Sequence, residues 1–185
     1  VEGILPCITQ TDAGPHVTGA ALFRDDVLVG RLDHELTQTL LMARGLIDRG
    51  VLTVGTAEDS AAFDVRSCTA QLRTGEQEGE LWASYEIALQ LELSQGTGQG
   101  GELNAKLRTQ YEQMAASAIE ERFERLCEIL QETYAVDALG VGRQFHRYHP
   151  DLWAQVGEQW EIAFADCRIT AQVDAALLGG GRSLE

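Results

Sequence analysis

An almost perfect alternation of apolar side chains with polar or small ones over residues 80–93 is the feature that most constrains the fold. Successive side chains of a β-strand point to opposite faces of the sheet, so a period of two predicts a strand with one buried face. A second strand-like run occupies residues 61–73, and residues 74–79 separate the two runs. We therefore predict a long antiparallel hairpin. The alternating apolar positions are Leu81, Ala83, Tyr85, Ile87, Leu89 and Leu91.

A helical period follows in residues 104–134, where apolar side chains recur at steps of three and four. Such a stripe predicts an amphipathic helix, and Asn104 is a residue type favoured at a helix N-cap. Thirty residues of helix measure about 45 Å, which is enough to cross a whole sheet. The predicted solvated side carries Glu120, Glu121, Arg125 and Glu128. The apolar stripe is Leu107, Tyr111, Met114, Ala118, Phe123, Leu126 and Leu130.

Shorter patterns on the N-terminal side predict a hairpin, a helix and a short strand. Apolar and β-branched residues at 17–23 and 27–32 flank an Arg-Asp-Asp turn, which is typical of a hairpin. Asp33 can cap a helix that ends at Gly45 or Gly50. A brief apolar run after this helix predicts a strand ahead of the long hairpin.

The region after the long helix predicts a turn at 137–142 and then a helix that Pro150 begins. Trp153 and Trp160, seven residues apart, are expected on one face of that helix. A final alternating run at 167–177 predicts the last strand. The order β-β-α-β-β-β-α-α-β indicates an α+β fold, mainly an antiparallel sheet with the long amphipathic helix and shorter helices packed on it.

The net charge of the chain makes some classes of partner unfavourable. The chain of 185 residues has 29 acidic and 14 basic side chains, a net charge of −15. Such a protein does not concentrate on nucleic acid or on anionic lipid, so both are disfavoured as direct partners. No stretch reaches the roughly 20 apolar residues that span a bilayer. Because the chain starts at Val1 and ends in a vector-like Leu184-Glu185, we expect 179–185 to be a tail of partly vector origin and any targeting signal to lie outside it.

Four cysteines are spread along the chain without a C-x-x-C pair: Cys7, Cys68, Cys127 and Cys167. Four cysteines allow three disulfide pairings, and the sequence does not choose among them. The surroundings of the last three are apolar. We predict buried free thiols that behave as small hydrophobic residues.

Gly96, Gly98 and Gly101 match the pattern G-x-G-x-x-G of dinucleotide-binding loops. That site requires a parallel βαβ unit and an acidic residue on the next strand. Here the preceding strand belongs to an antiparallel hairpin, and the acids about twenty residues further on lie in the middle of a helix. A flexible loop is the better interpretation, so no cofactor is predicted.

His146 and His149 lie near one side of a helical turn, with Asp151 close in sequence. Two imidazoles and a carboxylate could bind zinc or iron, but nothing elsewhere in the chain offers a matched ligand at a diagnostic spacing. Polar surface residues are the favoured interpretation. The sequence also lacks the G-x-S-x-G elbow of hydrolases. We therefore predict no catalytic, cofactor-binding or metal-binding residue.

Two strings resemble a known family. Residues 19–32, GAALFRDDVLVGRL, are similar to the opening of the C-terminal domain of Ger(x)C spore germination lipoproteins. Residues 137–153, DALGVGRQFHRYHPDLW, are similar to a second signature of that domain. The resemblance spans residues 17–178 and leaves 1–16 as an N-terminal extension or a first strand. The chain departs from the family in its acidic middle and its number of cysteines.

The resemblance implies a non-enzymatic C subunit of a spore nutrient-germinant receptor that acts in receptor assembly and signal coupling. The expected partners are the A and B subunits. The full-length protein would be lipid-anchored to the outer face of the spore inner membrane through an anchor absent from this sequence, and this fragment would be soluble. Direct sensing of a small germinant is the alternative, and an unrecognised enzyme using His146 and His149 is a third option.

Seven residues of the matching strings and Trp160, which follows the second string, are expected to have structural roles and are candidates for partner contacts; we call these eight the signature residues. Asp137 can cap the turn that follows it, while Gly140 and Gly142 allow positive φ or close backbone approach. Pro150 suits a first helical turn, and Trp153 is expected to anchor that helix with a large buried area. The set is Gly30, Asp137, Gly140, Gly142, His146, Pro150, Trp153 and Trp160.

Overall fold

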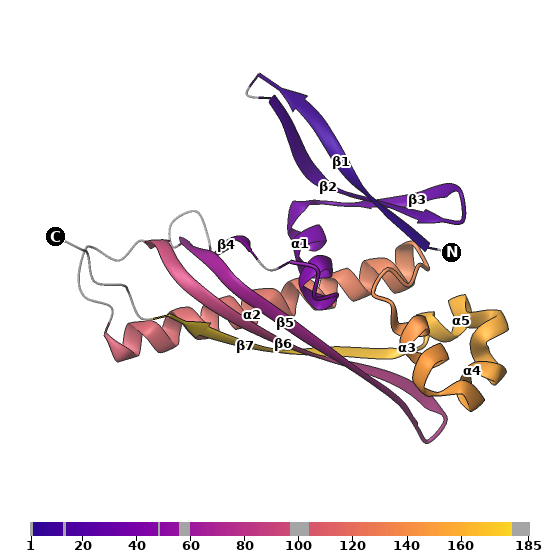
Figure 1. Cartoon of the computed structure of the whole chain (residues 1–185). Helices are drawn as coiled ribbons and strands as arrows, with labels where there is room; N and C mark the ends of the chain where they lie inside the picture. The colour runs from indigo at the N-terminus through magenta and orange to yellow at the C-terminus, as the bar shows by residue number, and fades with distance from the viewer. Residues whose placement is uncertain (1, 13, 48, 56–59, 97–103, 179–185) are drawn as a thin grey trace.

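The computed structural model describes residues 2–178 apart from 13, 48, 56–59 and 97–103. It contains two sheets, one long helix and several short helices, which confirms the predicted α+β class (Figure 1). No helix in these described ranges is long and apolar enough to cross a bilayer. Two glycines of the G-x-G-x-x-G pattern, Gly98 and Gly101, lie outside the described residues.

The larger sheet has four strands in the order β4-β5-β6-β7. The predicted long hairpin is confirmed as β5 and β6, which pair antiparallel along almost their whole length. The last strand, β7, pairs parallel to β6, since the chain returns through α2 and the short helices before entering it. The strands are β4 Gly50–Gly55, β5 Ser60–Gln77, β6 Glu80–Gly96 and β7 Arg168–Leu177.

The turn of the long hairpin is shorter than predicted. Residues 74–77 continue β5, and Glu78 and Gly79 alone connect the strands. Both residues have positive φ, 56° and 89°, as a two-residue turn between twisted antiparallel strands requires. Gly75 pairs with Trp82 in this ladder, and only glycine fits there without a shift, because a Cβ would meet the Trp82 ring at 2.6 Å.

Two helices cover one face of this sheet and enclose the core. They are α1 His34–Ala43 and α2 Ala105–Glu128, which continues as the π-helical turn η1 Ile129–Thr133. The predicted caps are confirmed, since Asp33 accepts from Leu36 N at 2.8 Å and Asn104 accepts from Leu107 N at 2.9 Å. The predicted solvated side is wrong for Glu120, which bonds β7. Buried rings from sheet and helix meet in pairs, Phe63 with Tyr111 and Tyr85 with Phe123.

The smaller sheet has the order β1-β2-β3, and its first two strands form a hairpin that projects from the body (Figure 1). The predicted hairpin around the Arg-Asp-Asp turn is confirmed as β2 and β3. Residues ahead of it form a further strand, β1. The bounds are β1 Glu2–Thr11, β2 Gly14–Arg24 and β3 Val27–Leu32.

Short helices gather at the end of the molecule where β5 turns into β6, and we call them the helical cap (Figure 1). Pro150 begins α4 as predicted. The prediction that a single helix carries both tryptophans is wrong. The helix breaks at Gly157, where the missing Cβ leaves space for the Trp153 ring. The cap consists of α3 Val141–Tyr148, α4 Pro150–Val156, the 3-10 turn η2 Gly157–Gln159 and α5 Trp160–Ala165.

The cysteines are free, and three of them are buried as predicted. Burial raises the pKa of Cys68 to about 11, and it raises the pKa of Cys127 and of Cys167 to about 12. Cys7 differs from the prediction, since it is half-exposed on the projecting hairpin.

Candidate interaction site

Asp137 organises the helical cap. Its Oδ1 accepts hydrogen bonds from the backbone N–H groups of Gly140 at 2.8 Å and Val141 at 3.0 Å. Its Oδ2 accepts from Gly142 N at 2.6 Å and from the indole Nε1 of Trp160 at 3.1 Å. One carboxylate therefore caps the N-terminus of α3 and ties α3 to α5. The capping role predicted for Asp137 is confirmed.

Opposing effects act on the Asp137 carboxyl. Burial raises its pKa from 3.8, because a charge is costly in an apolar surrounding, and the four hydrogen bonds from backbone and indole lower it. The side chain is 6% exposed. Because this buried acid accepts hydrogen bonds from four donors, we assign it a structural role in the cap.

The two signature glycines of the cap are required by space and backbone angle. Gly140 has φ +86°, which strains other residues. A Cβ on Gly142 would lie 2.5 Å from the Trp160 Nε1 and 3.1 Å from the Asp137 Oδ2. These geometries match the two roles proposed from the sequence, positive φ and close approach.

Aromatic rings form a row through the cap. Ring centroids are 5.3 Å apart between His149 and Phe145, 5.6 Å between Phe145 and Trp160, and 5.3 Å between Trp160 and Trp153. His146 ends the row, 5.4 Å from Trp153. The row links α3 to α4 and α5.

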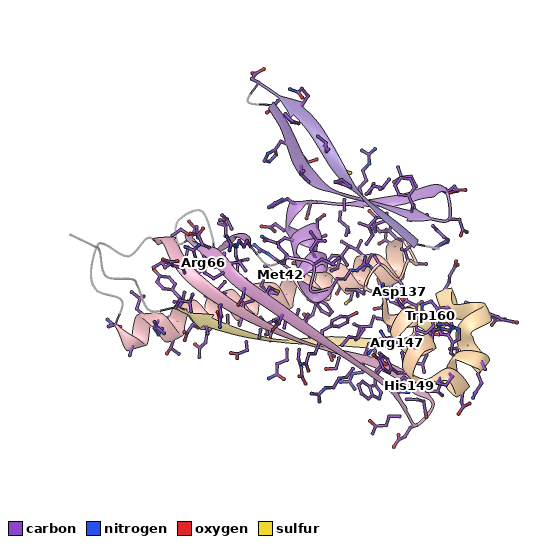
Figure 2. All side chains as sticks on the ribbon, in the orientation of Figure 1. Met42, Arg66, Asp137, Arg147, His149 and Trp160 are labelled. Carbon is purple, nitrogen blue, oxygen red and sulfur yellow. The ribbon has the colours of Figure 1, made fainter. Side chains whose placement is uncertain are left out.

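The two histidines point to different partners. His149 Nε2 lies 2.9 Å from the Thr74 carbonyl of β5, whereas exposed His146 makes an edge-on ring contact with Trp153. Asp151 is exposed beyond them. In the part of the chain that is described, no three His, Cys, Asp or Glu side chains are grouped for a metal ion. Figure 2 shows His149 with Asp137 and Trp160 at this end of the molecule.

A cleft of about 730 Å³ lies between the cap and the β2–β3 turn, and we call it the cap cleft. Trp153 and Trp160 line it, and both are half-buried. Trp153 packs against the core as expected, but it is not fully buried. Each ring packs on the cap with one part and faces the cleft with another. Charged side chains stand beside them: Arg24, Asp25, Arg143, Glu158 and Glu161.

Arg24 connects the two strings that resemble the family. Its guanidinium donates to the carbonyls of Tyr134 at 2.8 Å and Ala135 at 2.5 Å, and it forms an ion pair with Glu161 at 3.3 Å. Signature residue Gly30 is nearby, because a Cβ there would meet the Tyr134 ring at 2.4 Å. The β2–β3 hairpin is thus fastened where the long helix ends and the second string begins.

Several residues of this site were not singled out from the sequence. Arg24 stands inside the first family string, which was a usable signal. No sequence signal marks Tyr134, Glu161 or Gln131, because their roles depend on contacts between residues far apart in the sequence. Gln131 Nε2 donates to the carbonyls of Phe164 at 2.7 Å and Cys167 at 2.8 Å, which holds the end of α5.

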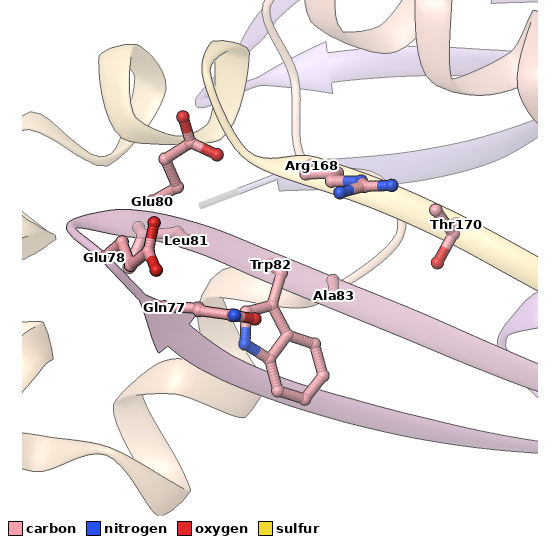
Figure 3. Close-up of a pocket in the computed structure, with 8 residues that line it drawn as sticks. All are labelled: Gln77, Glu78, Glu80, Leu81, Trp82, Ala83, Arg168 and Thr170. Atoms are coloured by element: carbon pink, nitrogen blue, oxygen red, sulfur yellow. The ribbon is translucent and has the colours of Figure 1, made fainter.

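A second hollow, of about 450 Å³, lies near the turn of the long hairpin (Figure 3). Trp82 and Ala83 of β6 and Arg168 and Thr170 of β7 line it together with polar residues of the turn. None of these residues was predicted as a site residue. Trp82 is half-buried and lies over Gly75.

Residues 18–181 match the family model described as spore germination B3/GerAC like, C-terminal. The match covers most of the chain. This chain belongs to that family. Its members are C subunits of spore germinant receptors. The resemblance inferred from the two strings is confirmed.

A solved structure supports the fold. The chain is similar to the crystal structure of the GerBC protein, with a TM-score of 0.85 and 17% sequence identity. The alignment covers 96% of this chain and 57% of the GerBC chain, so this chain spans little more than half the length of that protein. A search among curated proteins found no match.

Proposed function

We propose that this chain is the receptor-coupling part of a germinant receptor C subunit and that the cap cleft is a contact surface for a partner subunit. One observation carries the proposal: both family strings converge on the cleft, where Trp153 and Trp160 present ring surface to solvent. Half-exposed tryptophans on a rigid support are the residue type enriched at the centres of protein interfaces.

The proposed partners are the A and B subunits of the receptor. The full-length protein would be held at the outer face of the spore inner membrane by a lipid anchor outside this sequence. Its role would be assembly and signal coupling without catalysis. The fully bonded Asp137 and the separated histidines support that assignment, because each already has a structural partner.

Dipicolinate release from spores tests the proposal. Spores with this receptor as their single nutrient receptor would carry full-length protein with Trp153→Ala. We expect nutrient-triggered release to be lost, since truncating a central interface tryptophan costs about 2 kcal/mol or more of binding energy. Leu46→Ala is the control, because Leu46 is an exposed hydrophobic residue that lines neither the cap cleft nor the hollow at Trp82.

Both variants must first accumulate to the normal level and unfold at a similar denaturant concentration. Normal release with Trp153→Ala would remove the cap cleft as the contact surface. Normal release after deletion of the whole domain would overturn the receptor role itself.

Direct binding of a small molecule is the second candidate function, and the hollow at Trp82 favours it. A half-buried indole beside a guanidinium and carboxylates can hold a small polar ligand. A thermal-shift panel of amino acids, sugars and nucleosides tests it, because a ligand at 100 times its Kd adds about 2.7 kcal/mol of stability. A shift that disappears with Trp82→Ala would establish the site, and an unchanged melting temperature across the panel would exclude it for those ligands.

A further inference from the structure

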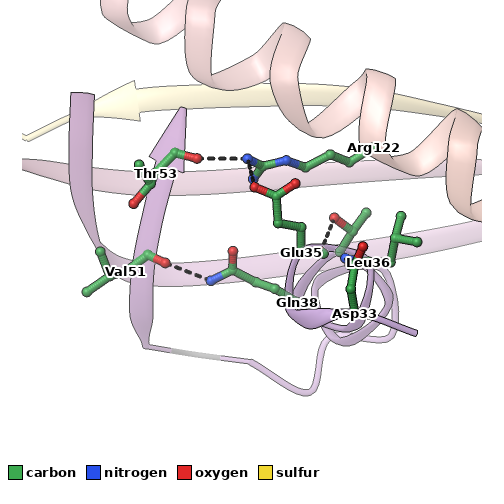
Figure 4. Close-up of polar contacts among 8 residues, drawn as sticks. Asp33, Glu35, Leu36, Gln38, Val51, Thr53 and Arg122 are labelled. Carbon is green, nitrogen blue, oxygen red and sulfur yellow. Dashed lines mark hydrogen bonds and ion pairs between the residues drawn. The ribbon is translucent and has the colours of Figure 1, made fainter. Parts of the chain in front are cut away.

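The two faces of the large sheet differ in what covers them. Helices α1 and α2 pack on one face and are fastened to its β4 edge. Gln38 Nε2 donates to the Val51 carbonyl at 2.9 Å, and Arg122 donates to the Thr53 carbonyl at 2.8 Å (Figure 4). The other face, which we call the open face, carries exposed side chains from the middle of β5, β6 and β7. On β7 the exposed residues are Arg168, Thr170, Gln172, Asp174 and Ala176.

The composition of the open face is that of a surface in contact with water. Its long charged side chains pair across the strands, since Arg66 Nη2 lies 2.5 Å from Glu92 Oε2 and Arg73 Nη2 lies 3.3 Å from Glu86 Oε2. Charged residues are depleted at the centre of a surface that another protein or domain buries. The open face therefore suits water or a polar ligand better than an apolar protein surface.

Trp82 interrupts this polar surface. Among the described residues of the large sheet, it is the one aromatic side chain that is not buried. Three indole atoms would lie 2.6–3.0 Å from a Cβ on Gly75, so the absence of that Cβ lets the ring lie directly on β5. The rest of the indole faces the hollow of about 450 Å³ near the hairpin turn (Figure 3). An aromatic ring held against a rigid sheet offers a stacking platform to a ligand.

A second hollow continues the first along the open face. The hollow beside Trp82 reaches Thr170, and the second, of about 280 Å³, begins at Gln172. These residues are consecutive exposed positions of β7 and lie about 7 Å apart, because a strand rises about 3.3 Å per residue. On the same basis, the row from Arg168 to Asp174 that lines both hollows measures about 20 Å. We call the two hollows together the sheet groove.

Uncharged polar side chains supply much of the lining of the sheet groove. An amide or a hydroxyl group both donates and accepts hydrogen bonds, as a sugar hydroxyl does. Four carboxylates and one guanidinium, that of Arg168, also line the groove, so an anionic ligand is repelled. The uncharged polar residues are Thr69, Gln71, Gln77, Thr170 and Gln172.

We infer that the sheet groove binds an uncharged oligosaccharide, with one sugar ring stacked on Trp82 and the following rings along β7. The C–H groups of a sugar ring form an apolar face that packs on an indole, while its hydroxyls reach the amides and hydroxyls around it. An extended peptide instead binds through backbone groups at a sheet edge, and a sheet face presents side chains alone. The proposal rests on the second candidate function, ligand binding at Trp82, and is independent of the cap cleft.

Fluorine NMR of the full-length protein labelled with fluorotryptophan tests the proposal. The Trp82 resonance is the one that disappears in Trp82→Phe. We expect cellotetraose or chitotetraose to shift it and to bind about tenfold more tightly than glucose or N-acetylglucosamine, because a linked ring enters the second hollow without a separate binding event. Calorimetric titration measures the affinities. Tetragalacturonate, a chain of the same length, should bind more weakly than either tetramer, because the carboxylates of the groove repel it.

Gln172→Ala separates the two hollows. It should weaken tetramer binding by about threefold to tenfold, the loss of one hydrogen bond, and leave monosaccharide binding unchanged. Because Gln172 is exposed, the fold should tolerate the change, and the unfolding midpoint checks this. Gln90→Ala is the matched control, since Gln90 is exposed on the same face and lines neither hollow.

The possible outcomes separate the ligand class from the site. Equal affinities for monosaccharide and tetramer overturn the sheet groove and leave a small-ligand site at Trp82. If an amino acid or a nucleoside shifts the Trp82 resonance and no sugar does, the oligosaccharide is overturned and the second candidate function stands. If no compound shifts it, both are overturned, and the role proposed for the cap cleft is unaffected.

Discussion

The carboxylate of Asp137 shows how much of the helical cap depends on a single side chain. It bonds three successive backbone N–H groups and the indole of Trp160. Residues far apart in the sequence are positioned by it, because α3 and α5 share this acceptor. Removing one acceptor here leaves buried donors without partners, which costs more than the bonds themselves contribute.

Asp137→Asn should therefore destabilise the protein by about 2–5 kcal/mol, since the new amide would direct N–H groups at two of the four donors. Urea unfolding followed by circular dichroism measures the loss. Asp174→Asn, on the exposed side of β7, is the control and should stay within about 0.5 kcal/mol of wild type. An equal, small effect of both substitutions would contradict the role assigned to Asp137.

Thiol chemistry should distinguish Cys7 from the buried cysteines. A thiol whose pKa is raised to about 12 has a thiolate fraction of about 10⁻⁴ at pH 8, and the thiolate is the reactive form. Native protein should react with a thiol reagent at Cys7 alone, and unfolded protein at four sites. Cys7→Ser should abolish the native reaction. Rapid labelling of Cys127 in the native state would show that the core opens more readily than its packing indicates.

At the scale of elements, helices and strands that produce a periodic sequence pattern were predicted correctly. Features that depend on contacts across the fold were not. The alternation in β6 and the stripe of α2 predicted both elements, because each period reflects burial against a neighbour. The break between α4 and α5 was missed, since it depends on the ring of Trp153 filling the space above Gly157. The site was predicted in part: Asp137 and its glycines carry local signals, whereas Tyr134 and Glu161 act through distant partners.

Arg24 fastens the small sheet to the cap. Arg24→Ala should cost about 1–3 kcal/mol, because the two carbonyls lose hydrogen bonds to a charged donor. Hydrogen exchange should rise around Tyr134 and Val136 in particular. Arg66→Ala removes an exposed ion pair with Glu92 and should cost less than about 1 kcal/mol. Equal losses would mean that the Arg24 contacts do not hold the sheet.

Gly142→Ala sets two effects against each other inside α3. Helix propensity favours alanine by up to about 1 kcal/mol, whereas a Cβ pressed against Trp160 and Asp137 should cost about 1–3 kcal/mol. We expect net destabilisation in denaturant unfolding. Gly50→Ala is the control, because its Cβ would meet its nearest neighbour at an ordinary 3.4 Å. A stabilised Gly142→Ala protein would show that Trp160 moves aside freely.

At the scale of the whole molecule, charge opposes compactness. A net charge of −15 creates self-repulsion that dissolved ions reduce. Raising the ionic strength from low to physiological should therefore raise Tm, by about 2–4 °C for each 1 kcal/mol gained at this chain length. NaCl and KCl should act alike, because the effect is screening. A falling Tm would mean that ion pairs dominate over repulsion.

The parallel pairing of β6 with β7 also decides when the protein can fold. β7 is synthesised after the other strands of its sheet, and its register joins Trp82 to Arg168 and Leu91 to Leu177. At ordinary translation rates the ribosome needs roughly 5–15 s to make the residues between β6 and the end of β7. During that interval the growing chain holds a long hairpin with one unpaired side and an uncovered apolar face. The sheet is therefore completed only once β7 has been synthesised, and the yield of folded protein depends on protecting the nascent chain until then.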